Sequence, residues 1–169
     1  MYAQRDEVGG VGAKLYYADN TIQHAGIVIG LGAHRAAGHT HYKDDKMHLG
    51  YMGRLCYAQD VTAVTGACLL VSRAQYDEVG GLDEEFRVAF NDVDFCLKLR
   101  HAGYLNVFTP FAELYHYESK TRGMEEGEKQ KRFQQEVDLF RKKWKADLDA
   151  GDPYFNPNFS LDYSDYTIK

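Results

Sequence analysis

The sequence predicts an α/β fold in which a mixed sheet is flanked by helices. Segments with strand-like alternation are interleaved with helix-like segments along the 169 residues. A long stretch near the C-terminus also has the periodicity of an amphipathic helix. The composition, with 44% hydrophobic and 27% charged residues, is that of a single globular domain.

The predicted strands begin in the first half of the chain. Residues 11–17 alternate apolar and polar side chains, and residues 21–31 have a β-branched centre. Residues 32–51 form a long connection rich in glycine and histidine, and loops of this length are often functional. The run of residues 62–71 is β-branched, small and apolar, which predicts a buried strand.

Two shorter helices are predicted in the middle of the chain. Ser72 is placed to cap a helix over residues 73–79, which a pair of glycines ends. Asn91 or Asp92 is placed to cap the next helix, which Gly103 ends.

The last third is predicted to contain two short strands, a long helix and an irregular segment. The strands cover residues 105–109 and 112–116, on either side of a proline. Apolar residues at steps of three and four predict an amphipathic helix over residues 123–150. We therefore divide the chain into a domain over residues 1–151 and an irregular C-terminal strap over residues 152–169.

Charge and cysteine content exclude several classes of protein. Twenty Lys and Arg against 25 Asp and Glu give a net charge of -5, so we expect no nucleic-acid partner. Cys56, Cys68 and Cys96 lack C-x-x-C spacing, which indicates reduced thiols in place of a disulfide framework or a zinc site. No apolar run approaches the roughly 20 residues of a membrane span, and no secretory leader follows Met1. We expect a cytoplasmic location, including the inner face of the cytoplasmic membrane.

An acidic segment supplies the first candidate site residues. Asp92 and Asp94 form a D-x-D pattern at the start of a predicted helix. A carboxylate there can act as a general base toward a hydroxyl or help to hold a divalent cation. The same residues also fit a purely structural role as an N-cap and a first-turn acid that interact with the helix dipole. Spacing alone does not choose between these interpretations.

Histidines supply the second group of candidates. His34, His39, His41 and His48 fall within one loop, and the spacing of the middle pair would suit a metal in extended chain. Because no cysteine and no helical H-x-x-x-H pair accompanies them, solvated or capping histidines are the competing interpretation. His116 differs from the others because it ends a predicted strand soon after the acidic segment.

Several segments together resemble the acceptor-side half of family 2 glycosyltransferases, and bacterial rhamnosyltransferase and O-antigen type enzymes most of all. They are TIQHAG at 21–26, AVTGACLLV at 63–71, VGGLDEEF at 79–86, NDVDFCLKLR at 91–100, AGY at 102–104, Tyr115-His116 and DPYFNPN at 152–158. The resemblance covers nearly the whole chain in order. It implies part of a GT-A fold, with no counterpart here of the half that binds the nucleotide-sugar.

The resemblance implies an inverting glycosyl transfer from a nucleotide-sugar to a glycan or lipid-linked acceptor in cell-surface polysaccharide synthesis. Asp92 corresponds to the catalytic base, which takes the proton of the acceptor hydroxyl. Asn91 stands where glutamate is common in the family. Because the donor-binding half is missing, we expect the chain alone to transfer sugar weakly or not at all.

The resemblance also implies substrate and metal contacts. Gly66 and Ala67 correspond to small residues that line the sugar pocket, and Asn91 and Asp94 to neighbouring substrate contacts. His116 corresponds to a histidine near the metal or diphosphate. The metal would be Mg²⁺ or Mn²⁺, whose main D-x-D ligands belong to the half of the family that this sequence does not contain.

Two other functions remain open from the sequence. One is a non-catalytic carbohydrate-binding or docking module derived from a glycosyltransferase, which the thirteen tyrosines would suit because aromatic rings stack on sugars. The other is a metal hydrolase built on the histidine loop. A sheet edge left open by the missing half would favour self-association.

Overall fold

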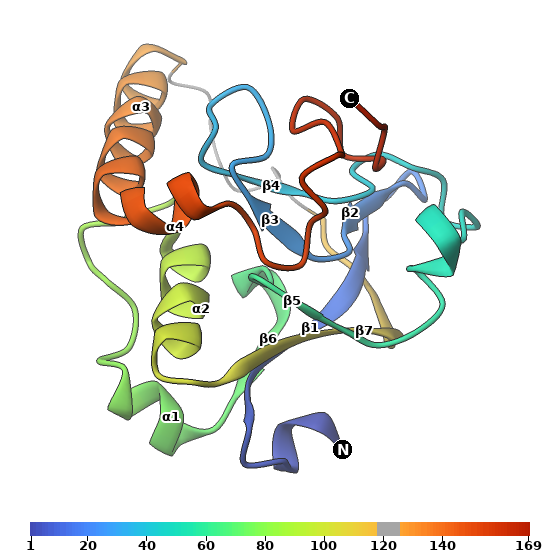
Figure 1. Cartoon of the computed structure of the whole chain (residues 1–169), viewed down its shortest axis with the longest axis horizontal. Helices are drawn as coiled ribbons and strands as arrows, with labels where there is room; N and C mark the ends of the chain where they lie inside the picture. The colour runs from blue at the N-terminus through green and yellow to red at the C-terminus, as the bar shows by residue number, and fades with distance from the viewer. Residues whose placement is uncertain (118–125) are drawn as a thin grey trace.

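A mixed sheet forms the centre of the computed structural model, which describes residues 1–117 and 126–169 (Figure 1). Its strand order is β2-β1-β7-β5, and β6 also pairs with β1. The strands are β1 (Val8–Tyr16), β2 (Ile22–His24), β5 (Gln59–Val61), β6 (Leu69–Val71) and β7 (Leu105–Tyr115). The central pair β1 and β7 is parallel, whereas β2, β5 and β6 run antiparallel to their neighbours. The predicted mixed α/β class is confirmed.

The helices gather on one side of the sheet (Figure 1). They are α1 (Arg73–Glu78), α2 (Asn91–His101), α3 (Glu126–Lys143) and α4 (Lys145–Ala150). Helix α2 leads directly into β7 and contacts both central strands, so it belongs to the crossover that parallel neighbours require. None of the described helices has the length and apolar character that crossing a bilayer demands.

The main core lies between α2, α3 and the sheet. Cys96, Leu97, Phe108 and Phe140 are fully buried there. Strand β1 approaches the chain at Val64 so closely that a Cβ on Gly12 would lie 2.5 Å from the Val64 Cβ. Glycine at this position therefore allows the segment after β5 to pack on the sheet.

The predicted strand over residues 62–71 is wrong as a single buried strand. A 3₁₀ turn over Gly66–Cys68 interrupts it, and the strand that follows the turn is the short, partly exposed β6. The Thr65 hydroxyl accepts a hydrogen bond from the Ala67 N–H, which favours the turn over a continued strand.

Helix α2 begins differently from the prediction. Phe90 is the N-cap residue, in the left-handed conformation with φ 63°, in place of Asn91 or Asp92. The Phe90 ring stacks on those of Phe133 and Phe140, so tertiary packing of an aromatic ring determines where the helix starts. The predicted cap of α1 is confirmed, because Ser72 Oγ accepts from the Gln75 N–H at 3.2 Å.

The end of the chain differs from the prediction in two places. The two predicted strands on either side of Pro110 form the single strand β7, whose register against β1 shifts between Thr109 and Glu113. The predicted helix over residues 123–150 breaks at Trp144 into α3 and α4, and its first residues lie outside the described part of the chain.

A separate antiparallel pair, β3 (Ile27–Ile29) with β4 (Ala37–His39), lies within the region predicted as strand and loop. The strap of residues 152–169 lies against this pair and the following loop. Phe155 and Tyr166 of the strap bury their rings with Val28 and Leu31. Backbone bonds continue the contact, from Gly32 N to Leu161 O and from His41 N to Ser164 O.

Candidate functional site

The first site feature is a carboxylate held at a turn. Asp92, in the first turn of α2, accepts the Gly66 N–H on Oδ2 at 2.8 Å and the Val93 N–H on Oδ1 at 2.9 Å. The structure thus joins two predicted site residues that are 26 positions apart. Two backbone donors fix the orientation of the carboxylate, and each of its oxygens retains a lone pair for a further partner.

The other small and polar candidates surround this carboxylate. Gly66 and Ala67 are exposed on the 3₁₀ turn, and Asn91 Oδ1 accepts the Asp92 N–H at 2.8 Å. A Cβ at Gly66 would lie 3.3 Å from the Asp92 Cβ, so a larger side chain would press on the carboxylate. Asn91 therefore steadies the backbone of Asp92, and Gly66 leaves room beside its carboxylate.

Asp94 lies in a different environment. Its side chain has no exposed surface, and its Oδ1 accepts from Trp144 Nε1 at 2.9 Å and pairs with Lys143 Nζ at 2.6 Å. Lys98 Nζ lies 3.6 Å from the other oxygen. These contacts tie α2 to the end of α3, and with them in place Asp94 has no surface to offer a substrate.

Beside the 3₁₀ turn lies a cavity of about 640 Å³, here called the aromatic cavity. Thr65, the residue before Gly66, is part of its wall, so the Asp92 carboxylate is bonded to the residue next to that wall. His116 also contributes to the wall. The remaining lining residues are Tyr17, Gln23, Leu31, Gly32, Gly38, His39, Tyr42, Phe133, Asp162, Tyr163 and Ser164.

A hydrogen-bonded set of side chains supports one wall of the aromatic cavity. His116 Nδ1 lies 2.9 Å from Gln23 Oε1, which orients the imidazole. His24 Nδ1 lies 3.0 Å from His39 Nδ1, and the Thr65 N–H points to His24 Nε2 at 3.4 Å. Burial lowers the pKa of His24 well below its usual value, and the neighbouring His39 adds to this effect. His24 is therefore neutral and can accept from Thr65.

The residues present do not by themselves fit a Mg²⁺ or Mn²⁺ site at His116. These cations prefer carboxylate, carbonyl and water oxygens, whereas His116 offers a single imidazole nitrogen, Nε2, because its Nδ1 lies against Gln23 Oε1. Among residues 1–117 and 126–169, the cluster of metal-ligating side chains consists of His41, Asp44 and His48 and does not include His116. We therefore derive no chemical step through a metal.

Sequence reasoning missed most of the cavity wall. The strap contributes Asp162, Tyr163 and Ser164, and helix α3 contributes Phe133. No local pattern distinguished these residues. The aromatic content of the strap was the available signal, since a segment rich in tyrosine but without periodicity is expected to cover a surface.

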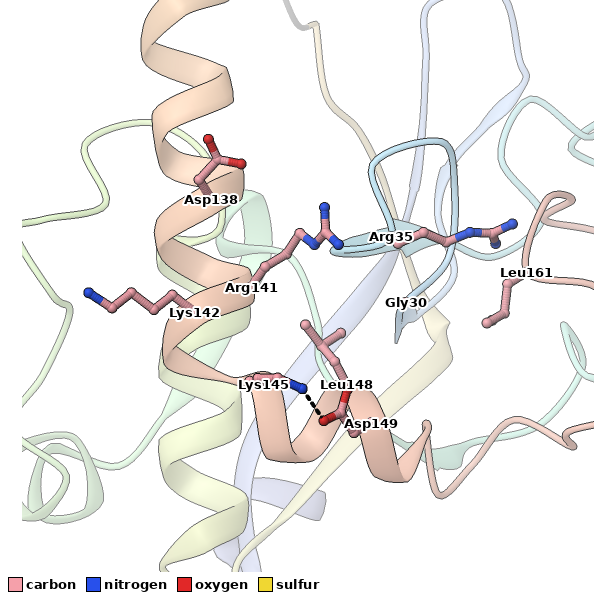
Figure 2. A pocket seen from close by; sticks show the side chains of 9 residues that line it. All are labelled: Gly30, Arg35, Asp138, Arg141, Lys142, Lys145, Leu148, Asp149 and Leu161. Carbon is pink, nitrogen blue, oxygen red and sulfur yellow. Dashed lines mark hydrogen bonds and ion pairs between the residues drawn. The ribbon is translucent and has the colours of Figure 1, made fainter.

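A second cavity, of about 460 Å³, lies between α3, α4 and the loop that precedes β4 (Figure 2). Arg141 points from α3 toward the loop that carries Arg35, whereas Lys142 points away (Figure 2). Arg35 forms an ion pair with Asp162 and Lys145 with Asp149. This cavity contains no predicted site residue, and internal pairing offsets much of its charge.

Comparisons with known proteins agree with the sequence resemblance in part. The chain is 54% identical over 169 residues to the uncharacterized protein y4gI of Sinorhizobium fredii. This alignment covers 99% of the chain and 18% of the relative. It is 33% identical over 173 residues to the O-antigen biosynthesis protein RfbC of Myxococcus xanthus, covering 99% of the chain and 13% of that protein. A 60-residue stretch is 40% identical to an N-acetylglucosaminyl-diphospho-decaprenol L-rhamnosyltransferase of Mycobacterium tuberculosis, covering 36% of the chain and 20% of the enzyme.

The chain has a distant, partial similarity to glycosyltransferases of cell-surface polysaccharide synthesis. The matched stretches cover 13–20% of the length of the relatives. No family model matches the chain. No solved structure matches it either.

Proposed function

We propose that this chain is the acceptor-side, base-bearing part of a GT-A glycosyltransferase in bacterial cell-surface polysaccharide synthesis. The observation that carries the proposal is the Asp92 carboxylate, bonded to the Gly66 N–H beside the aromatic cavity. Partial similarity to an O-antigen biosynthesis protein and a rhamnosyltransferase supports it. The nucleotide-sugar donor would bind largely to residues outside this chain.

In the proposed reaction Asp92 is the general base. An acceptor hydroxyl donates a hydrogen bond to the carboxylate, and its oxygen attacks the anomeric carbon from the face opposite the diphosphate. As the new glycosidic bond forms, the bond to the diphosphate breaks and the hydroxyl proton passes to Asp92. The anomeric configuration is inverted, and the nucleoside diphosphate leaves with the electron pair of the broken bond.

The aromatic cavity is the proposed acceptor site. Its tyrosines can stack on sugar rings, while Gln23, His116 and Asp162 supply hydrogen-bonding groups for hydroxyls. Tyr42 and Tyr163 are exposed at the cavity, so a saccharide can reach their rings. The acceptor would therefore be a glycan, free or linked to a lipid.

Because the chain alone is expected to transfer little or no sugar, the test uses transfer assays on the purified chain joined to a donor-binding GT-A half. Labelled UDP-, dTDP- and GDP-sugars are offered with a panel of saccharide acceptors in the presence of Mn²⁺. Asp92→Asn should reduce any transfer by at least about 100-fold, the usual contribution of a general base. Asp60→Asn removes an exposed carboxylate elsewhere and should leave transfer unchanged. Equal transfer by the wild type and Asp92→Asn would overturn the assignment of the base.

The aromatic lining favours one second candidate, a carbohydrate-binding module without catalysis. Saccharide binding measured by calorimetry, with no transfer from any donor even when the chain is joined to a donor-binding half, would support it. Tyr163→Ala should then weaken binding at least about fivefold, because loss of an aromatic face removes about 1 kcal/mol or more. A chain that neither binds saccharide nor transfers sugar would contradict both functions.

A further inference from the structure

Three potential metal ligands meet on the loop between β4 and β5, separate from the aromatic cavity. His41 Nδ1 lies 2.8 Å from Asp44 Oδ2, and His48 Nδ1 lies 3.6 Å from the same oxygen. The three ligand atoms all fall within 4.8 Å of one another. We refer to His41, Asp44 and His48 as the His-Asp-His cluster.

We propose that the His-Asp-His cluster binds one Zn²⁺ ion. Two imidazole nitrogens and one carboxylate oxygen are the donor set that Zn²⁺ commonly takes. With metal–ligand bonds of about 2.0–2.2 Å, tetrahedral geometry places neighbouring ligand atoms roughly 3.3 Å apart. The separations in the cluster bracket that value, so small side-chain rotations suffice to enclose an ion. This inference does not depend on the proposed glycosyl transfer.

His48 Nδ1 must give up one long hydrogen bond to coordinate an ion. The Gly50 N–H donates to this nitrogen at 3.1 Å and occupies the single lone pair that a metal would need. The Asp44 carboxylate oxygen 3.6 Å away carries further lone pairs. A small rotation of the exposed His48 ring would exchange the Gly50 bond for a bond to the ion.

The backbone holds the ligands in place before any ion arrives. Ile22 N donates to Asp44 O and Lys43 N to Ile22 O, each at 2.8 Å, so the loop is bonded to β2. His41 has φ 54°, a left-handed conformation that few residues other than glycine adopt. Neighbouring contacts must maintain this conformation, and it directs the imidazole toward Asp44.

Accessibility differs along the His-Asp-His cluster in a way that suits ion entry. The His41 side chain is 1% exposed, that of Asp44 27% and that of His48 52%. Coordination through Nδ1 places the ring proton on Nε2, so the long 3.4 Å contact from Tyr51 N is lost.

The loop that carries the His-Asp-His cluster also contacts the strap. His41 N donates to Ser164 O at 2.7 Å, and the ring of Tyr166 lies 5.1 Å from that of His41. The same loop carries Tyr42, and the strap carries Ser164, both in the wall of the aromatic cavity. The bound ion would therefore stabilise one side of that cavity.

The test is calorimetric titration of the full chain, freed of any polyhistidine tag, with ZnCl₂ after treatment with a chelator. We expect one ion per chain with a dissociation constant in the micromolar range or below, and a higher melting temperature in its presence. Asp44→Asn and His48→Gln alter partly exposed ligands and should each weaken binding at least tenfold. His34→Gln changes an exposed histidine of the same region outside the cluster and should bind like the wild type.

Four results would overturn the proposal. The first is that a wild-type chain with a normal circular-dichroism spectrum binds no Zn²⁺, and the second is that His48→Gln binds Zn²⁺ as tightly as the wild type. The third is that His34→Gln weakens Zn²⁺ binding as much as the cluster variants do. The fourth is that His39→Gln alone abolishes Zn²⁺ binding. The last result would assign the ion to the His24–His39 pair instead.

Discussion

The buried carboxylate of Asp94 permits a quantitative test of how the helices are held together. In Asp94→Asn the amide oxygen can still accept from the Trp144 indole, but the charge opposite Lys143 is lost. Hydrogen bonds to charged groups contribute about 1.5–3 kcal/mol. The new NH₂ group would also face Lys98, at the oxygen position that has no hydrogen bond in the native side chain. We expect a loss of about 2–4 kcal/mol in the free energy of unfolding.

For a domain of this size, each kcal/mol corresponds to about 2–4 °C in melting temperature. Urea denaturation and thermal melting followed by circular dichroism measure both quantities. The matched control is Asp83→Asn, which removes the other carboxylate partner of Lys143, one that is partly exposed. The control should cost about 1 kcal/mol or less. A change below 1 kcal/mol for Asp94→Asn would refute the reasoning and reopen a substrate role for this residue.

Three further predictions follow from packing, titration and thiol burial. Gly12→Ala should lower the free energy of unfolding by about 3 kcal/mol in denaturant titrations, because the new methyl group would overlap Val64. The control is Gly127→Ala, at a helical position with open space, which should stabilise the chain by about 0.5–1 kcal/mol. Because the pKa of His24 is depressed in the folded chain, the unfolded chain binds a proton below about pH 6.5 that the folded chain does not. His24 should therefore lower the free energy of unfolding by up to about 1.4 kcal/mol for each unit that the pH falls. Urea midpoints between pH 7.5 and 5 would show the slope, and a slope unchanged in His24→Gln would contradict its origin. In labelling with a thiol reagent, exposed Cys56 should react in the native state, whereas Cys96, whose pKa burial raises to about 12, should react only after unfolding.

Local patterns predicted the parts of the fold that local chemistry determines. Alternation located β1, and the Ser72 side chain caps α1 as expected. The start of α2 could not be predicted in this way, because the stacking of Phe90 on an aromatic ring of α3 fixes it. The 3₁₀ turn after Thr65 likewise depends on one hydroxyl that competes with strand hydrogen bonding.

The candidate site could be predicted only in part, for a similar reason. The pairing of Asp92 with Gly66 joins the first turn of α2 to the 3₁₀ turn before β6, and only the family resemblance pointed to both residues. The aromatic cavity draws Phe133 and Tyr163 from segments in which no local pattern distinguished these two residues. Contacts between residues this distant in sequence depend on the completed packing, which periodicity does not encode.

The strap has a consequence for the order in which the molecule is made. Its contacts reach back more than a hundred positions, as in the bonds from Ile29 N to Asp152 and from Arg35 to Asp162. A ribosome releases the N-terminal segments first, so the sheet can form while the strap is still being synthesised. The aromatic cavity, by contrast, has no complete wall until Tyr163 has emerged. Within the residues of this chain, the wall of the cavity is therefore completed only after translation has passed Tyr163, well after the strands of the sheet have emerged.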